Sequence, residues 1–209
     1  MQQAICHTVR KEWDIDIVSM SFGFPHEVTP IREAIVDAQR LKHDKILFFA
    51  AANNDGPNSQ EMFPAFFESV ISVRGTKFDG SFDSQYDPQP WSHKGEIMYG
   101  TLGKDVACGW TAGSLVKSGC SVATPIMAAI AATIIWFVAC PANGFSEKAR
   151  GEIQTRRGIL SVFDVMSEKQ KSTKRSLEPW QLFKDGKGSM VENVEVSVRH
   201  ALNKLPEIE

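Results

Sequence analysis

The chain has 209 residues, 43% of them hydrophobic, so it is long enough to bury a sizeable core as a single domain. Its formal net charge of −2 gives no electrostatic reason to expect nucleic acid or an anionic membrane as a partner. The four cysteines form no Cys-x-x-Cys pair, so we expect no zinc site. We expect no cofactor, and calcium binding stays open.

The N-terminal residues indicate a cellular location only if Met1 is the true start of the protein. Residues 1–4 carry no basic region followed by an apolar stretch, so no signal peptide is visible. If Met1 is the true start of the protein, we expect a cytosolic protein with reduced cysteines.

The first half of the chain alternates between segments typical of helices and of strands. Apolar residues at near-helical spacing predict helices, and continuous apolar runs predict buried parallel strands. The expected segments are a helix over 2–12, a strand over 14–21, a helix over 30–41, and strands over 46–51 and 69–73. This order predicts an α/β fold with a mostly parallel sheet and right-handed crossovers.

The second half contains a polar loop, a long apolar run and further helices. Asp, Ser, Gly and Pro are frequent over 78–95, which predicts a surface loop. The later segments are expected to be short strands near 96–99 and 105–108, a helix over 146–157 capped by Ser146, a polar segment over 169–187, and an amphipathic helix over 191–205.

Residues 118–125, which precede an apolar run over 126–140, give the most specific signal. We expect Ser121 at the start of a helix, where backbone N–H groups lack intrahelical partners. Gly119 permits a tight turn before the helix, and Pro125 is tolerated in a first helical turn. A serine Oγ held there can attack a carbonyl while the serine N–H binds the oxyanion. The alternative is a plain N-cap on a buried helix.

The apolar run also has about the length of a membrane span, roughly 20 residues. Pro125 and Pro141 bracket it, alanine is abundant within it, and its flanks are not strongly basic. These features favour a core helix buried on all sides over a membrane helix.

Residues 119–125, Gly-Cys-Ser-Val-Ala-Thr-Pro, resemble the serine motif of subtilisin-like proteases, Gly-Thr-Ser-(Met or Val)-Ala-(Thr or Ala)-Pro. The serine is the nucleophile in that family, so the resemblance implies this role for Ser121. Cys120 stands where the family usually has Thr, and the Val-Ala-Thr-Pro-Ile form is similar to the fungal-type branch. The resemblance implies a three-layer subtilisin-like fold with a buried central helix after the serine.

Residues 51–56, Ala-Ala-Asn-Asn-Asp-Gly, resemble the family's Ala-Ala-Gly-Asn-(Asp or Glu)-Gly segment, whose Asn amide completes the oxyanion hole. The resemblance implies this role for Asn54, with Asn53 in place of the family's Gly. An amide N–H suits the role because it donates a hydrogen bond without titrating. The alternative is an ordinary Asn-Asp-Gly turn.

Ser21-Phe22-Gly23 is similar to the family's Ser-Leu-Gly strand, which pairs with the substrate backbone and walls the primary specificity pocket. The substrate-binding residues that the resemblance implies are Ser21, Phe22 and Gly23 on one wall, Ala51, Ala52 and Asn53 on the other, and Met62 at the floor. Apolar walls suggest a hydrophobic substrate side chain. The alternative is ordinary strand and core packing.

One departure from the family pattern limits the expected activity. The family's Asp-(Ser or Thr)-Gly and His-Gly-Thr motifs precede the Ser-Leu-Gly strand, and neither occurs in this sequence. His7, the one histidine before Ser21, lies in a predicted helix. The other histidines, which we expect at surface positions rather than as substitute bases, are His26, His43, His93 and His200. Without a base, the Ser121 hydroxyl stays protonated and is a poor nucleophile.

Two hypotheses about function follow. In the first, residues 1–185 are a partial peptidase domain that lacks the Asp and His segments, and 186–209 form a C-terminal helical extension. This serine endopeptidase would cleave peptide or protein substrates through an acyl-enzyme on Ser121, but the chain alone would be inactive. Whether the full-length polypeptide has further domains stays open. In the second, the chain is a pseudoprotease that binds peptides along residues 21–23 without cleaving them.

Overall fold

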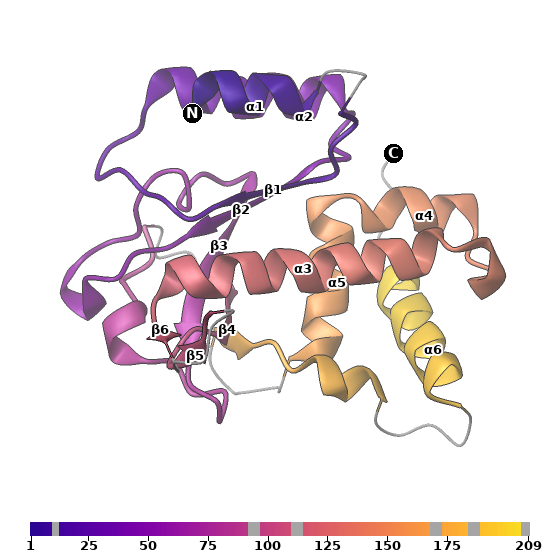
Figure 1. The fold of residues 1–209 in the computed structure, drawn as a ribbon. Coiled ribbons are helices and arrows are strands. Elements are labelled where there is room, and N and C mark those ends of the chain that lie inside the picture. The colour runs from indigo at the N-terminus through magenta and orange to yellow at the C-terminus, as the bar shows by residue number, and fades with distance from the viewer. Residues whose placement is uncertain (10–12, 92–96, 110–114, 168–172, 184–188, 206–209) are drawn as a thin grey trace.

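The computed structural model describes residues 1–9, 13–91, 97–109, 115–167, 173–183 and 189–205 (Figure 1). The strands are β1 (Ile17–Met20), β2 (Leu47–Ala51), β3 (Val70–Thr76), β4 (Met98–Leu102), β5 (Val106–Ala107), β6 (Val116–Lys117) and β7 (Lys174–Ser176). The α-helices are α1 (Gln2–Thr8), α2 (Thr29–Leu41), α3 (Cys120–Ala139), α4 (Glu147–Ile153), α5 (Arg156–Met166) and α6 (Met190–Asn203). The short 3-10 helices are η1 (Gly56–Asn58), η2 (Ser84–Tyr86), η3 (Pro141–Asn143) and η4 (Pro179–Phe183).

The main sheet has the order β1-β2-β3-β4-β7, and every neighbouring pair is parallel. β5 and β6 form a separate antiparallel ribbon. Figure 1 shows α1 and α2 on one side of the sheet and α3 with the later helices on the other. The predicted α/β fold in three layers, with a mostly parallel sheet, is confirmed.

Each face of the sheet buries its own hydrophobic core, because successive side chains of a strand point to opposite faces. In β2, Leu47 and Phe49 belong to the core under α3, whereas Phe48 and Ala50 belong to the core under α1 and α2. All five residues of β2 are buried. This burial on both faces explains why the strand reads as a continuous apolar run rather than as an alternating one.

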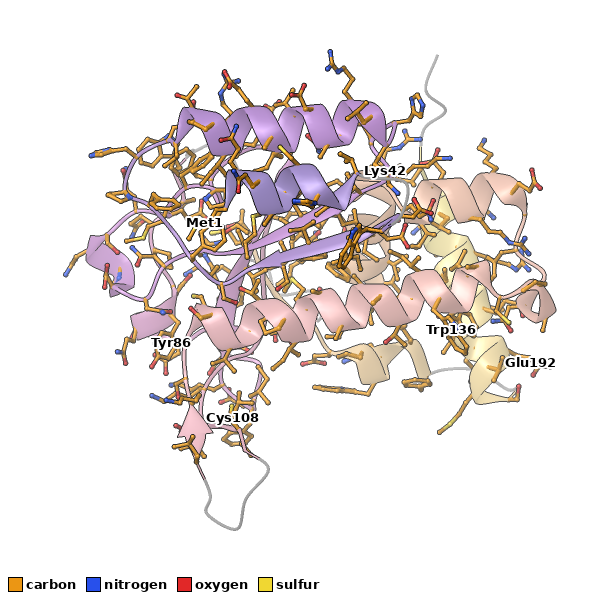
Figure 2. All side chains as sticks on the ribbon, turned by 45° about the horizontal axis from the view of Figure 1, so that its top comes forward. Met1, Lys42, Tyr86, Cys108, Trp136 and Glu192 are labelled. Carbon is orange, nitrogen blue, oxygen red and sulfur yellow. The ribbon has the colours of Figure 1, made fainter. Side chains whose placement is uncertain are left out.

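Helix α3 lies across β1 to β4, but it is not buried on all sides as the sequence suggested. Its outward stripe is exposed and includes Pro125, Ala129, Ala132, Thr133, Trp136 and Ala139. Trp136 is the largest of these side chains and is 70% exposed (Figure 2). In the described part of the chain, α3 is the one helix long and apolar enough to cross a membrane, a test that core helices also pass. Its inner face packs on the sheet, which supports the core assignment.

The C-terminal helices differ from the prediction over 146–157. Ser146 caps a helix as expected, but this helix, α4, ends at Ile153, and Thr155 caps a second helix, α5. Helix α6 begins with a capping box between Ser189 and Glu192, and its inner residues join the core shared with α3. The predicted division at 185/186 falls among the residues outside the described ranges and stays a prediction.

Several helices and strands have bounds that differ from the predicted ones, although the type of each element is as predicted. The strand expected over 69–73 continues to Thr76, and the strand expected over 14–21 covers only Ile17–Met20. The helix expected over 2–12 is α1, which ends at Thr8, and residues 10–12 lie outside the described ranges. The polar segment expected over 169–187 contains β7 and η4.

Candidate active site

Gly119 turns the chain into α3, as the sequence predicted. Its φ of +136° lies in a region that residues with a side chain rarely adopt. A Cβ at this position would also lie 3.1 Å from Asn54 Nδ2 and 3.2 Å from Asn54 Oδ1. The Asn54 amide therefore packs directly on Gly119, which brings the two motifs together.

Ser121 is not the N-cap of the helix. Gly119 occupies that position, α3 begins at Cys120, and Ser121 is its second residue. The alternative of a plain N-cap serine is therefore wrong, whereas the expected position of Ser121 at the start of the helix is confirmed, because Ser121 lies in the first turn. Its side chain is partly exposed.

Pro125 lies in the second turn of α3 rather than in the first, where it was expected. A proline inside a helix removes the N–H that would bond to the carbonyl four residues earlier. That carbonyl belongs to Ser121, and the Ser21 hydroxyl donates a hydrogen bond to it at 2.9 Å. The Ser21 hydroxyl thus replaces the hydrogen-bond donor that Pro125 lacks. This contact joins the end of β1 to the first turn of α3.

The backbone donors at the start of α3 are divided between Asn54 and Gly119. The Cys120 N–H donates to Asn54 Oδ1 at 2.8 Å, and the N–H groups of Val122 and Ala123 donate to the Gly119 carbonyl. In the part of the chain that the structure describes, the Ser121 N–H has no such partner. Because Asn54 Oδ1 accepts from Cys120, the Asn54 Nδ2 end of the exposed amide is left to donate.

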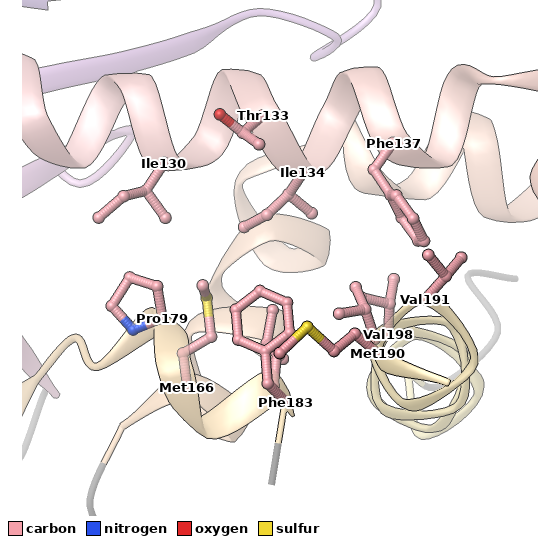
Figure 3. A pocket seen from close by; sticks show the side chains of 12 residues that line it. Ile130, Thr133, Ile134, Phe137, Met166, Pro179, Phe183, Met190, Val191 and Val198 are labelled. Atoms are coloured by element: carbon pink, nitrogen blue, oxygen red, sulfur yellow. The ribbon is translucent and has the colours of Figure 1, made fainter. Parts of the chain in front are cut away.

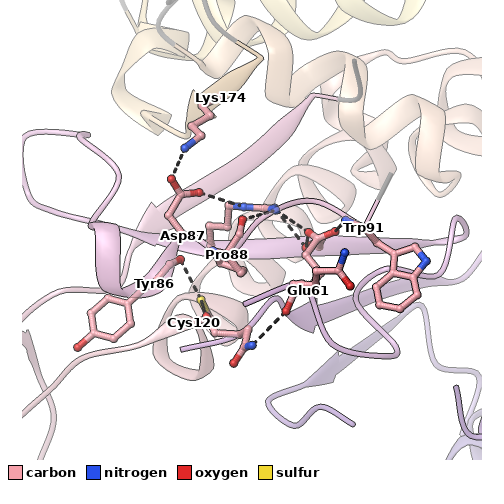
Figure 4. Close-up of polar contacts among 11 residues, drawn as sticks. Glu61, Tyr86, Asp87, Pro88, Trp91, Cys120 and Lys174 are labelled. Atoms are coloured by element: carbon pink, nitrogen blue, oxygen red, sulfur yellow. Dashed lines mark hydrogen bonds and ion pairs between the residues drawn. The ribbon is translucent and has the colours of Figure 1, made fainter. Parts of the chain in front are cut away.

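Cys120 forms polar contacts inside the core. The side chain is fully buried, and this burial raises the pKa of the thiol, which therefore stays protonated. The Sγ lies 2.9 Å from the Asn53 carbonyl oxygen and 3.3 Å from that of Tyr86, so the thiol donates between them (Figure 4). Cys120 thus links α3 to the loops that follow β2 and β3.

The Asn53 side chain forms its hydrogen bonds within its own loop. Its amide donates to Ser59 Oγ at 3.0 Å and to the Gln60 carbonyl at 3.1 Å, while Asn53 Oδ1 accepts from the Asn54 N–H at 2.6 Å. These bonds fix the turn that carries Asn54. The implied role of Asn53 in a substrate pocket wall stays a prediction.

The remaining residues of the implied substrate pocket lie close together. A Cβ on Gly23 would lie 2.7 Å from Met62 Cβ, so Met62 packs against Gly23. The Met62 N–H also donates to the Ala52 carbonyl at 2.9 Å. Met62 therefore lies between the two implied walls, and Phe22 packs edge-on against Phe24 beside them.

A buried ionic cluster, which the sequence reasoning missed, supports the segment before Met62 (Figure 4). Arg74 on β3 is fully buried, and its Nη2 lies 2.7 Å from Glu61 Oε1. Its Nε lies 3.3 Å from Asp87 Oδ1, and Asp87 also pairs with Lys174 of β7. Two cations thus balance two anions. An arginine directly after the apolar run at 69–73 was the available signal.

No histidine in the described ranges donates to or accepts from the Ser121 hydroxyl. His26, His43 and His200 are exposed, as the sequence predicted, and His93 lies outside the described ranges. His7 on α1 is also exposed. The structure thus brings together a serine, a free backbone N–H and a side-chain amide.

Comparison with known proteins agrees with the family resemblance found in the sequence. The model described as the Subtilase family matches residues 1–139. The chain is 30% identical over 128 residues to an intracellular serine protease of Paenibacillus polymyxa, a match that covers 59% of this chain and 37% of the relative. The chain therefore spans little more than a third of the length of this curated relative.

Solved structures share the fold at lower identity. The prenylagaramide maturation protease PagA has a TM-score of 0.65 at 18% identity, covering 92% of this chain and 68% of its own. The protease domain of PatA has a TM-score of 0.67 at 17% identity, covering 95% of this chain and 64% of its own. The PatG macrocyclase, solved with a peptide, has a TM-score of 0.55 at 20% identity, covering 72% of this chain and 45% of its own. These likenesses extend the shared fold past residue 139.

Proposed function

The chain belongs to the subtilase family, and from that premise we propose that it carries the nucleophile and the oxyanion donors of a serine endopeptidase. In this reaction Ser121 Oγ attacks the carbonyl carbon of a peptide bond, and the carbonyl oxygen becomes an oxyanion. The Ser121 N–H and the Asn54 amide donate to that oxyanion. A base takes the Ser121 hydroxyl proton during the attack and gives it to the departing amine, which leaves an acyl group on Ser121. Water then hydrolyses this ester to the free acid and restores the hydroxyl.

One contact carries this proposal. The Cys120 N–H bonds to Asn54 Oδ1 at 2.8 Å, which orients the amide so that its NH2 end is free beside the first turn of α3. An N-cap serine in an ordinary turn would need no side-chain amide held in this way. Since Asn54 is exposed, its free donor can reach a substrate.

We also propose that the base and the acid that orients it are supplied by residues other than those of this sequence. The support is that the family's Asp and His motifs do not occur here and that the histidines of the described ranges are exposed. The proposed endopeptidase site is then incomplete in this chain, which is inactive by itself because an unassisted serine hydroxyl stays protonated.

A second candidate function is a peptide-binding pseudoprotease. The exposed Ser21 and Gly23, next to the end of β1, favour it because an extended peptide can pair with such a segment. A binding module has no need for a free Asn54 donor or for a reactive Ser121. The two candidates therefore differ in whether Asn54 affects the reactivity of Ser121.

The test is the rate at which a fluorophosphonate probe labels the purified chain at alkaline pH, where hydroxide replaces the missing base. We expect one label per chain, lost in Ser121→Ala, and a rate about 100- to 1000-fold lower in Asn54→Ala. Asn58→Ala removes another exposed amide of the same loop and should leave the rate unchanged. Labelling that survives Ser121→Ala, or that falls equally in Asn54→Ala and Asn58→Ala, rejects the endopeptidase proposal in favour of the binding module.

A further inference from the structure

Cys120 contacts two consecutive residues of the loop that follows β2. Its backbone N–H donates to Asn54 Oδ1 at 2.8 Å, and its thiol donates to the Asn53 carbonyl oxygen at 2.9 Å. The same sulfur lies 3.3 Å from the Tyr86 carbonyl oxygen (Figure 4). A thiol carries one hydrogen, so it donates to one carbonyl at a time, and the shorter distance favours Asn53. One residue of α3 therefore holds both the side chain of Asn54 and the peptide unit that precedes it.

The thiol contact lies inside the core. Cys120 is fully buried and belongs to a small cluster with Ala51, Ala52 and Tyr86, and Asn53 is itself buried. Among the residues that the structure describes, no other group donates to the Asn53 carbonyl. Hydrogen bonds are stronger in such surroundings than in water, and a buried carbonyl without a donor is costly. Removal of the thiol would therefore disturb the loop at this peptide unit.

The other polar groups of Asn53 do not connect the loop to α3. Its side-chain amide donates within the loop, and its Oδ1 accepts from the Asn54 N–H at 2.6 Å. These bonds shape the turn, whereas the thiol bond ties the turn to the helix that carries Ser121. The position of Asn54 relative to Ser121 thus depends on the residue between Gly119 and Ser121.

From these contacts we propose that Cys120 is a positioning residue, whose thiol holds the Asn53 carbonyl and thereby keeps the Asn54 amide in place as an oxyanion donor. This inference rests on the proposed function, in which the amide binds the oxyanion. The thiol is fully buried and acts through the loop rather than on the substrate. Because burial raises the pKa of the Cys120 thiol, the donor hydrogen is retained at mildly alkaline pH.

The rate of fluorophosphonate labelling of the whole chain at mildly alkaline pH tests this role in a double-mutant cycle. Cys120→Ala should lower the rate about ten-fold, because a displaced donor loses part of its effect on the oxyanion. In an Asn54→Ala background, Cys120→Ala should have almost no further effect, since the residue through which it acts is absent. Cys120→Ser keeps a donor and should restore most of the rate. An unchanged rate in Cys120→Ala, or equal losses in both backgrounds, overturns the proposal.

A control variant separates local positioning from a general loss of packing in α3. Ile134 lies on the same helix, about 21 Å along its axis from Cys120, among apolar side chains of α3, η4 and α6 (Figure 3). Its side chain is 5% exposed, so Ile134→Val removes a buried methyl group and should lower the free energy of unfolding. The labelling rate of the folded variant should stay unchanged. A loss as large as that of Cys120→Ala would reject the positioning role.

Failure of this inference and failure of the proposed function give different results. If Asn54→Ala lowers the labelling rate and Cys120→Ala does not, only the positioning role is rejected. If Asn54→Ala leaves the rate unchanged, both are rejected.

A second measurement applies if circular dichroism shows that Cys120→Ala is misfolded. The infrared S–H stretch is recorded in a chain whose other cysteines, Cys6, Cys108 and Cys140, are replaced by Ala. We expect the Cys120 band at a lower wavenumber than that of a simple alkanethiol in hydrocarbon solvent, because donation to a carbonyl weakens the S–H bond. A band at the alkanethiol position shows that the thiol does not donate and overturns the proposal.

Discussion

At the scale of single residues, the first turns of α3 depend on an exchange of hydrogen-bond donors between two segments. Pro125 leaves the Ser121 carbonyl without an intrahelical partner, and the Ser21 hydroxyl provides one at 2.9 Å. Ser121 is thereby connected to the residues that resemble the family's substrate-binding strand. The hydrogen bond links these residues directly to Ser121.

This exchange predicts a coupling between two substitutions. Ser21→Ala should lower the free energy of unfolding by about 1 kcal/mol, the usual net value of one hydrogen bond. In a Pro125→Ala background the new N–H can bond to the Ser121 carbonyl, so Ser21→Ala should cost much less. Urea denaturation of the four proteins measures the coupling. An equal cost of Ser21→Ala in both backgrounds contradicts this explanation.

The sequence could predict the Gly119 turn and the helix start at Ser121, because both lie in one short local motif. The roles of Ser121 and Asn54 stay predictions. It could not predict that Cys120 joins two loops, because this depends on contacts with Asn53 and Tyr86, which are far away in the chain. The same limit applies to the bond between Ser21 and Ser121, which are 100 residues apart. Residue identity is visible in a sequence, but a partner on another element is not.

At the scale of elements, the division between α4 and α5 depends on a close backbone contact. A Cβ on Gly158 would lie 1.9 Å from the Glu152 carbonyl oxygen, so α5 can begin where it does only with glycine at this position. The sequence predicted one helix over 146–157 with Ser146 as its cap, and it did not show the break between Ile153 and Arg156. The constraint that separates the two helices is steric, and it is visible only in the three-dimensional structure of the turn.

Gly158→Ala should therefore destabilise the protein by about 1–3 kcal/mol or more, since overpacking against backbone forces the chain to move. Gly151→Ala in α4 is the matched control, because the nearest atom to its added Cβ would be Lys45 Nζ at an ordinary 3.7 Å. That substitution should be neutral or stabilising by about 0.5–1 kcal/mol. Thermal or urea unfolding compares the two, and similar effects would contradict the steric account.

Strand positions were predicted better than strand ends. The apolar run over 46–51 corresponds to β2, which starts at Leu47, because burial on both faces gives a continuous signal. The run over 69–73 stops at Arg74, where β3 continues to Thr76. The arginine looked like the end of a buried strand because a buried charge is rare unless paired. Its partners, Glu61 and Asp87, come from loops that the pattern did not connect to the strand.

At the scale of the whole molecule, the outward face of α3 is unusual for a protein surface. The helix contains no charged residue, and its exposed side chains are mostly apolar, with Trp136 the largest. Apolar exposure on this scale favours contact with another surface. The expectation of a helix buried on all sides was wrong because β1 to β4 cover only the inner face.

This face predicts self-association at high protein concentration. Trp136→Lys should weaken the association constant by about ten-fold or more, since it replaces apolar contact area by a charge. Val36→Lys is the control, because it makes the same kind of change at an exposed position of α2. Sedimentation velocity over a range of concentrations measures both. If the two variants associate alike, or if the parent chain stays monomeric throughout, α3 is not the contact surface.

The position of β7 has a consequence for how the chain reaches its fold. β7 completes the sheet by pairing with β4, although α3, α4 and α5 all lie between these strands in the sequence. During synthesis, one edge of β4 therefore has no β7 to pair with until Lys174 to Ser176 emerge from the ribosome. Pairings between such distant segments form slowly. The nascent chain is then most exposed to aggregation after α3 has been made and before β7 arrives.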